Sequence, residues 1–193
     1  MPQNRRMGLE SSKQRSVLID AAEAILCDEG YAGISARNVA TRAGLTKQLL
    51  YYYFRTMDDL ILALVRRVNE HRLERFEEVM RSPDPMRELW DLNNNPAGAA
   101  LATELTAIAA HREAVRAEIV ASARQFRMLQ VRAVSDFLAD RGMGDRPAAG
   151  IVMIAVALAK TFTSEAALGL TEGHAEALSI VERMLSEFAP QAG

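Results

Sequence analysis

The chain of 193 residues has one cysteine, Cys27, so it can form no disulfide bond within itself. This scarcity fits a reducing compartment, and we expect the protein in the cytoplasm. No apolar stretch follows the basic residues near the N-terminus, so we expect no signal peptide. The longest apolar run, from Pro147 to Ala159, has 13 residues, whereas a membrane span needs about 20. We therefore expect a helix buried in protein there, and no membrane partner.

A strong net charge is also missing, because the overall value of −2 points to no particular partner. The distribution of charge is more informative. Residues 1–57 hold eight Lys and Arg against five Asp and Glu, and the remainder holds 15 against 20. A basic head on an acidic body is compatible with a nucleic-acid-binding module joined to a second domain.

Motifs of catalysis and metal binding do not occur in the sequence. His71, His111 and His174 lie far apart without metal-ligand spacing, and there is no second cysteine to join them. No nucleophile elbow, P-loop or dinucleotide-binding glycine motif is present. We therefore expect no catalytic residue, no metal site and no cofactor.

Apolar residues recur at helical spacing along almost the whole chain. In the first such segment Val17, Ala21 and Ile25 form a stripe, with Ser11 or Ser12 as the N-cap and Gly30 as the stop. Eight further helices are expected near residues 35–43, 46–54, 58–81, 86–92, 99–110, 113–141, 147–170 and 173–188. No series of alternating strands is evident. The sequence therefore predicts an all-α fold of about nine helices.

The aromatic run LLYYYF at residues 49–54 would favour a strand by composition, but such a strand would have no partner. The run is therefore better read as a helix, in which residues four apart share a face. Its apolar side then consists of Leu49, Leu50, Tyr53 and Phe54, and its polar side of Lys47, Gln48, Tyr51 and Tyr52. The apolar side is expected to anchor the helix in the protein core. The polar side is expected to present one ammonium, one amide and two phenols.

The residues upstream of this helix predict what it packs against. Two helices that cross through a short turn need a small residue where they approach, a turn residue that tolerates positive φ, and an apolar residue reaching back. Ala40, Gly44 and Leu50 fill these places at the right separations. The pattern predicts a helix-turn-helix, and chance placement of small residues in an Ala-rich chain is the alternative.

The segment AILCDEGYAGISARNVATRAGLTKQLLYYYFRTMDDLILALV resembles the DNA-binding region of the TetR family of transcriptional regulators. The resemblance covers about residues 12–65. It implies a three-helix DNA-binding domain at 1–57, a helical ligand-binding and dimerisation domain at 58–193, and a homodimer.

Carried over by position, the resemblance implies DNA contacts from Ser35, Ala36, Arg37, Thr46, Lys47, Gln48, Tyr51 and Tyr52. Two positions depart from the family pattern. Leu49 stands where a small or hydroxyl residue is frequent, and Met57 stands where a phosphate-binding lysine is frequent. These departures put two contacts to the DNA phosphate backbone in doubt. Arg55, or Arg5 and Arg6 on an N-terminal arm, could compensate for them.

Candidate ligand-binding and dimer residues lie in the second domain. Core packing is the alternative role for the four apolar residues that could line a ligand pocket: Trp90, Phe126, Met128 and Phe162. The last two helices are broadly apolar, and we expect them to pair with their copies in a four-helix interface. The residues expected there are Ile151, Ile154, Ala155, Leu158, Ile180, Met184, Leu185 and Phe188.

These features predict a homodimeric regulator that binds palindromic half-sites in double-stranded DNA and is released, as a repressor, by a small apolar ligand. A regulator of the same architecture that activates, or that has no ligand, is the first alternative. The second is a helical enzyme or interaction protein whose helix-turn-helix is only structural.

Overall fold

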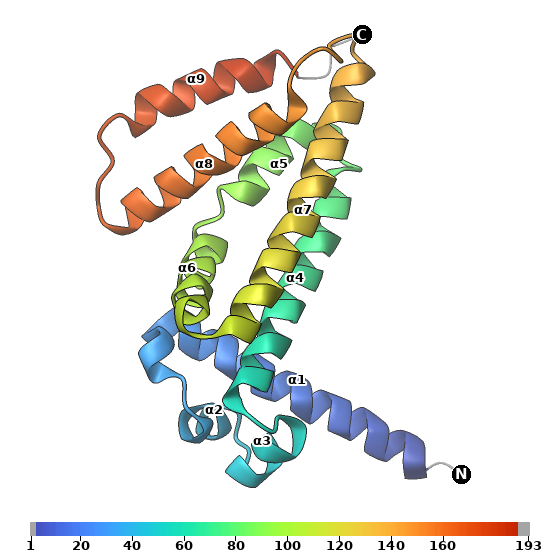
Figure 1. The fold of residues 1–193 in the computed structure, drawn as a ribbon, viewed down its shortest axis with the longest axis vertical. Coiled ribbons are helices and arrows are strands. Elements are labelled where there is room, and N and C mark those ends of the chain that lie inside the picture. The colour runs from blue at the N-terminus through green and yellow to red at the C-terminus, as the bar shows by residue number, and fades with distance from the viewer. Residues whose placement is uncertain (1–2, 189–193) are drawn as a thin grey trace. The chain divides into compact units, whose positions relative to one another are not determined.

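The computed structural model describes residues 3–188, and within that range it contains helices and turns but no strand. The prediction of an all-α fold with about nine helices is confirmed. Figure 1 shows their order. The elements are α1 (Gln3–Glu29), the 3-10 helix η1 (Tyr31–Gly33), α2 (Ala36–Arg42), α3 (Lys47–Tyr53), α4 (Met57–Val79), α5 (Pro85–Asn93), α6 (Pro96–His111), α7 (Glu113–Ala139), α8 (Ala148–Ala167) and α9 (His174–Ser186).

The chain divides into two compact units. The first unit takes in the chain up to Asn69 together with Leu101–Ala121, and the second takes in Glu70–Ala100 and the chain from Ser122 onward. The first unit thus extends past residue 57, because parts of α4, α6 and α7 share its core. The division into domains 1–57 and 58–193 concerns function and stays a prediction.

The core of the first unit is built from one apolar face of each helix. Leu18 and Ile25 of α1, Leu50 of α3, and Leu64 of α4 are each at most 1 % exposed. In the same cluster, α6 contributes Ile108, which is also fully buried. This shared core fixes α2 and α3 beside α1 and the start of α4 (Figure 1).

Two helix starts in the first unit show how local chemistry sets the boundaries. The hydroxyl of Thr56 accepts from the Asp59 N–H at 3.1 Å, and the Asp59 carboxylate accepts from the Thr56 N–H at 3.0 Å. This capping box satisfies donors at the beginning of α4. The expected cap of α1 at Ser11 or Ser12 is wrong, because α1 begins at Gln3 and continues through both serines.

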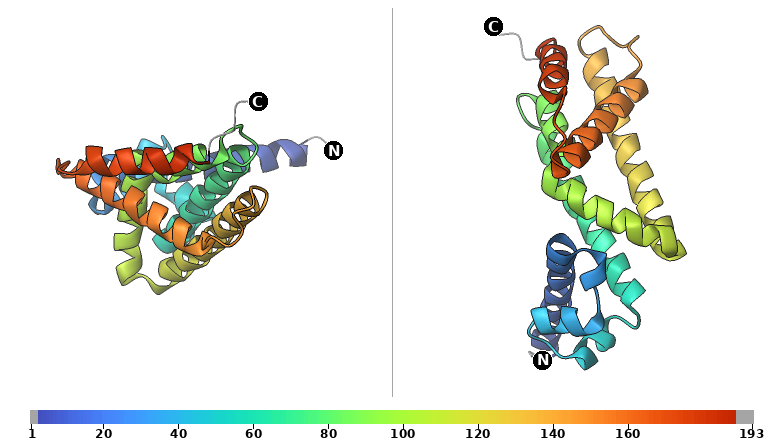
Figure 2. Two further views of the ribbon diagram at one scale, coloured as in Figure 1. Left: turned by 90° about the horizontal axis from the view of Figure 1, so that it is seen from above. Right: turned by 90° about the vertical axis from the view of Figure 1, so that its left-hand side faces the viewer.

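The second unit has two apolar clusters. One joins α4, α5, α7 and α8 through residues that include Phe76, Leu89, Phe126 and Val152. The other surrounds Trp90 and Phe162, with Val181 contributed by α9. Figures 1 and 2 both show α8 and α9 side by side, as the second cluster requires.

Helix α8 is less buried than its composition predicts. In the described part of the chain it is long and apolar enough to cross a membrane by length and composition, with a mean hydropathy of 1.4, and 17 % of the segment is buried. One such helix is weak evidence of a membrane span. Met153 and Ile154 are 56 % and 62 % exposed, so burial of the whole helix in protein stays a prediction that depends on a partner. This chain alone leaves an apolar face uncovered.

Phe54→Ala should lower the free energy of unfolding by about 3–5 kcal/mol, because Phe54 is 2 % exposed and its removal leaves a cavity. Tyr52→Ala is the matched control, since Tyr52 is 76 % exposed and its loss should cost at most about 0.5 kcal/mol. Urea denaturation measures both values. Similar losses in the two variants would contradict the assignment of inner and outer faces to α3.

Candidate nucleic-acid interface

A tight turn sets the angle between α2 and α3. Gly44 has a φ of +64°, which a residue with a side chain adopts only with strain. The Gly44 N–H donates to the carbonyl of Thr41 at 3.1 Å, and the Leu45 N–H donates to that of Ala40 at 2.9 Å. Ala40 is 2 % exposed, so the small residue does lie where the helices approach. The predicted helix-turn-helix geometry is confirmed.

Helix α3 is fixed by contacts on its inner side and by a cap at its start. Leu50 and Phe54 are buried in the core of the first unit, and the guanidinium of Arg15 lies 5.1 Å from the centre of the Phe54 ring. The Tyr53 hydroxyl donates to Oε1 of Gln14 on α1 at 3.0 Å. At its start, the Thr46 hydroxyl accepts from the Leu49 N–H at 3.2 Å. These contacts leave α3 little freedom to rotate about its axis.

The outer side of α3 is the polar face that the spacing predicts. Lys47 and Gln48 are exposed, Tyr51 is 50 % exposed and Tyr52 is 76 % exposed. In the described part of the chain no carboxylate pairs with Lys47. The face therefore offers one cation, one amide and two phenols on a rigid helix. That these groups touch DNA stays a prediction.

Helix α2 presents a different mixture at its N-terminal end. The Ser35 hydroxyl accepts from the Asn38 N–H at 3.1 Å and caps the helix, while Ala36 packs against the core. Arg37 is exposed and has no carboxylate partner among the described residues. Of the three residues expected at DNA from α2, Arg37 is thus the one that projects a free charge.

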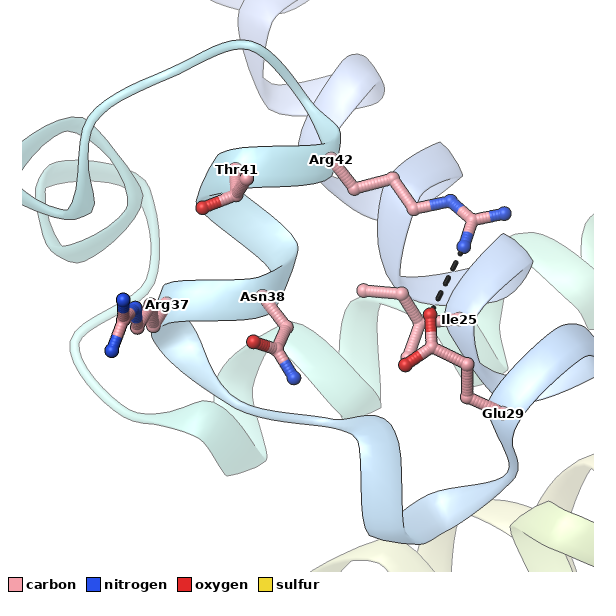
Figure 3. A pocket seen from close by; sticks show the side chains of 6 residues that line it. All are labelled: Ile25, Glu29, Arg37, Asn38, Thr41 and Arg42. Atoms are coloured by element: carbon pink, nitrogen blue, oxygen red, sulfur yellow. Dashed lines mark hydrogen bonds and ion pairs between the residues drawn. The ribbon is translucent and has the colours of Figure 1, made fainter.

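The second arginine of α2 is neutralised. Arg42 forms ion pairs with Asp28 and with Glu29, the latter at 3.2 Å. Figure 3 shows Arg42 turned toward Glu29 and Arg37 on the opposite side of the helix. Arg42 therefore ties α2 to the end of α1, and the unpaired positive charge of α2 lies on the side of Arg37.

An open cleft of about 530 Å³ lies between the ends of α1 and α2 (Figure 3). Ile25 is its one apolar lining residue, and the others are polar or charged and include the Arg42–Glu29 ion pair. Small-molecule sites of this volume are mostly apolar. We therefore assign the cleft no ligand.

The two departures from the family pattern have a structural reason. Met57 packs against the core of the first unit, and Leu49 is half-buried. Arg55 is exposed at the end of α3 and free of ion pairs within the described residues. Arg5 and Arg6 lie in α1, not on an extended arm. That Arg55 makes the contact to a DNA phosphate in place of Met57 stays a prediction.

This arrangement of side chains suits a DNA groove. Lysine can reach guanine acceptors and glutamine can pair with adenine in the major groove, where each base pair has a distinct pattern. Tyrosine hydroxyls and free arginines bond phosphates, which fixes register and orientation. Lys47 and Gln48 have the first chemistry, and Tyr51, Tyr52 and Arg37 have the second.

A cluster that the sequence did not predict joins this unit's distant segments. Arg112, between α6 and α7, pairs with Asp58 at the start of α4 and donates to the Tyr31 hydroxyl at 2.6 Å. The Tyr31 N–H donates to Oε2 of Glu104 on α6 at 2.8 Å. These partners are 54 to 81 residues apart in sequence and follow no local spacing, so only the fold reveals them.

The four candidate ligand-binding residues lie in the second unit, but not all together. The rings of Trp90 and Phe162 are 6.1 Å apart, and Phe126 pairs with Phe76 at 5.5 Å. Met128 is 73 % exposed and lines neither aromatic pair. The first pair also has a polar neighbour, His174, whose ring is 4.8 Å from Phe162. That a ligand binds at these pairs stays a prediction.

The candidate dimer residues fall into two groups. Ile154, Ile180 and Met184 are 62 %, 48 % and 57 % exposed. The others are half-buried and pack partly within their own chain: Ile151, Ala155, Leu158, Leu185 and Phe188. The first group could be covered by a partner, and the second supports it from beneath.

Comparison with known proteins agrees with this geometry. Residues 18–64 match the family model of the bacterial regulatory proteins of the tetR family. The chain is 31 % identical over 71 residues to the HTH-type transcriptional regulator PksA of Bacillus subtilis (strain 168). It is 27 % identical over 71 residues to the fatty acid metabolism regulator protein of the same strain. Each match covers 37 % of this chain. The matched segment spans 35 % of the length of PksA and 37 % of the length of the fatty acid metabolism regulator.

The fold extends the similarity beyond the matched sequence. A solved TetR transcription regulator from Haloarcula marismortui ATCC 43049 superposes with a TM-score of 0.72 at 22 % identity. The superposition covers 92 % of this chain and 97 % of that one. The likeness of fold therefore reaches most of the chain, while the sequence match is confined to the N-terminal part.

Gln48→Ala should weaken binding to the cognate DNA by about 1–3 kcal/mol and relax the base preference at one position, because a side-chain contact to a base edge is lost. Binding-site selection followed by titration measures both effects. Gln125→Ala is the control, since Gln125 is an exposed glutamine on α7. An unchanged sequence preference in Gln48→Ala would contradict the assignment of Gln48 to base reading.

Proposed function

We propose that this chain, which belongs to the TetR family by its DNA-binding region and its fold, is a repressor that a small molecule releases from operator DNA. The observation that carries the proposal is the exposed polar face of α3, held in place by the buried Leu50 and Phe54. Within the described residues, the side chains of this face form no hydrogen bond or ion pair. Operator DNA is the partner that it fits, and we expect the protein to act in the cytoplasm.

The uncovered apolar residues of α8 and α9 support a homodimer. Ile154, Ile180 and Met184 would be covered by the same residues of a second copy, because a two-fold interface uses one surface twice. The small residues Gly150, Ala155 and Ala159 of α8 permit close approach of helices. A dimer also gives two copies of α3, which can read two half-sites if they lie about one DNA turn apart, roughly 34–36 Å.

The second unit supplies the proposed ligand site. Its aromatic pairs Trp90–Phe162 and Phe76–Phe126 offer apolar surface, and His174 with its partner Glu165 at 2.8 Å offers a polar group. Such a mixture is typical of small-molecule sites. Helix α4 contains no Gly or Pro and contributes to both units. A ligand beside its C-terminal half, near Phe76 and Met80, would tilt α4 and change the separation of the two reading helices.

The contacts of Arg112 with Asp58 and Tyr31 could also carry a ligand-induced movement to the helix-turn-helix. Arg112 holds the junction of α6 and α7 to Asp58 at the start of α4 and to Tyr31 beside α2. A shift of that junction would therefore pull on the segments that orient the helix-turn-helix. Exposed ion pairs contribute little to stability, so the proposed role of this cluster is to transmit position.

A gel shift with DNA that flanks the gene tests DNA binding. The protein should retard a fragment that contains a palindrome, in the presence of excess non-specific competitor, at nanomolar to micromolar concentration. Retardation that vanishes with competitor would contradict the proposal and favour a structural helix-turn-helix. A reporter fused to the retarded fragment separates repression from activation, since expression should rise when the protein is removed.

Met184→Glu should convert a dimer of twice the 21.2 kDa chain mass into a monomer, because a carboxylate would be buried on an apolar surface. Light scattering at micromolar concentration measures the mass. Met128→Glu is the matched control, since Met128 is 73 % exposed on α7 and lies outside the proposed interface. A wild-type mass of one chain would contradict the dimer.

A ligand found by a thermal-shift screen of apolar and acyl compounds should lower operator affinity by about 5- to 150-fold, the usual range of allosteric coupling. Titration of operator DNA with and without the compound measures the change. Phe162→Trp should reduce the effect by filling space beside Trp90. Equal operator affinities with and without a bound compound would contradict release by ligand, and an unaffected response in Phe162→Trp would place the site elsewhere.

A further inference from the structure

Two neighbouring arginines of the second unit have no carboxylate partner among the described residues. The guanidinium carbon of Arg72 on α4 lies 3.7 Å from the centre of the Phe126 ring. Arg127 follows Phe126 directly on α7, and its Nη1 lies 2.9 Å from the sulfur of Met153. A thioether is a weak and neutral acceptor, so it compensates little of the charge.

Some other arginines of the same two helices do have a counter-charge. On α4, Arg66 pairs with Glu118 at 2.7 Å, and Arg75 pairs with Glu78 at 2.8 Å. On α7, even the exposed Arg132 lies 3.9 Å from Asp136. Arg72 and Arg127 instead face an aromatic ring and a thioether.

The surroundings penalise the charge of Arg72. Packing against Phe126 removes water from the guanidinium, and the positive charge of Arg127 adds repulsion, so that the pKa of Arg72 falls to about 10. Arg72 stays protonated at neutral pH. The side chain as a whole remains exposed, so a ligand can reach it. An anion placed between the two arginines would relieve both the repulsion and the lost hydration.

We propose that Arg72 and Arg127 bind the anionic head, a carboxylate or a phosphate, of an amphiphilic small molecule. The planar forks of two guanidinium groups suit the paired oxygens of either head. Met153, which touches Arg127 and is 56 % exposed, provides apolar surface for the remainder of the molecule, whereas Phe126 is buried and packs against Arg72. The inference rests on the ligand-responsive function proposed above and gives that ligand its chemical class.

The first experiment compares four probes of one chain length by thermal shift and calorimetry. Octanoate and octyl phosphate carry the proposed heads, whereas octanol is uncharged and octylamine is cationic. Octanoate or octyl phosphate should raise the melting temperature of the wild-type protein, and octanol and octylamine should raise it much less. Whichever of the two anions binds more tightly identifies the head. Equal shifts from octanol and from both anions would overturn the proposal.

Variants then test the two arginines. Arg72→Met and Arg127→Met keep an unbranched apolar stem against Phe126 and Met153 but remove the charge. Each should weaken binding of the preferred anion at least tenfold relative to wild type, with every thermal shift measured against that variant's own melting temperature. Arg132→Met is the control, since Arg132 is 84 % exposed on α7, and it should bind the anion as wild type does. Wild-type affinity in both Arg72→Met and Arg127→Met would overturn the proposal.

Operator binding separates this inference from the function on which it rests. If the anion binds to wild type and not to the variants, but no DNA fragment is retarded, the proposed function fails while the anion site stands. If DNA is retarded but all four probes act alike, the anion site fails while DNA binding stands. If both proposals hold, the preferred anion should release the operator from wild type and should leave it bound to Arg72→Met.

Discussion

The burial of Leu50 and Phe54 is the contact on which the reading surface of this protein depends. Both side chains are at most 2 % exposed, and they hold a helix of seven residues that could not be stable alone. Because successive residues of a helix turn by about 100°, fixing these two also fixes where Lys47, Gln48, Tyr51 and Tyr52 point. The aromatic run is thus divided between anchoring and exposure.

The rest of the first unit supports this placement. The positive φ of Gly44 sets the turn before α3, and the capping box of Thr56 and Asp59 starts the next helix. Arg112 links that start to α6 and to Tyr31. In the second unit the packing is incomplete, since apolar residues of α8 and α9 are not covered by the described part of the chain. That deficit is the physical argument for a second copy.

Much of the fold follows from local patterns that the sequence displays. Apolar spacing, glycines and prolines predicted all nine helices, and spacing by four predicted both faces of α3. The predicted start of α1 was wrong because the helix begins at Gln3. A serine that can serve as an N-cap, such as Ser11, lies inside the helix and does not mark its first turn. For α8, composition shows that the helix is apolar, but it does not show whether its own chain or a partner covers each face.

Long-range contacts were beyond such reasoning. Nothing in the sequence near Arg112 indicates Asp58 or Tyr31 as its partners, and nothing near Arg72 indicates that Phe126 would lie beneath it. The same limit explains Met128, whose apolar character suggested a pocket although its side chain is 73 % exposed. Pairings of this kind depend on how helices cross, which no single helix encodes.

The most direct test of the central claim is an NMR titration of the protein with the DNA that flanks its gene. If the face of α3 reads DNA, amide shifts should change most at residues 35–37 and 46–52 at a stoichiometry of two chains per palindrome. The amides of α9 should respond far less. Shifts that are largest outside α2 and α3, or that are equal with DNA of unrelated sequence, would contradict the account.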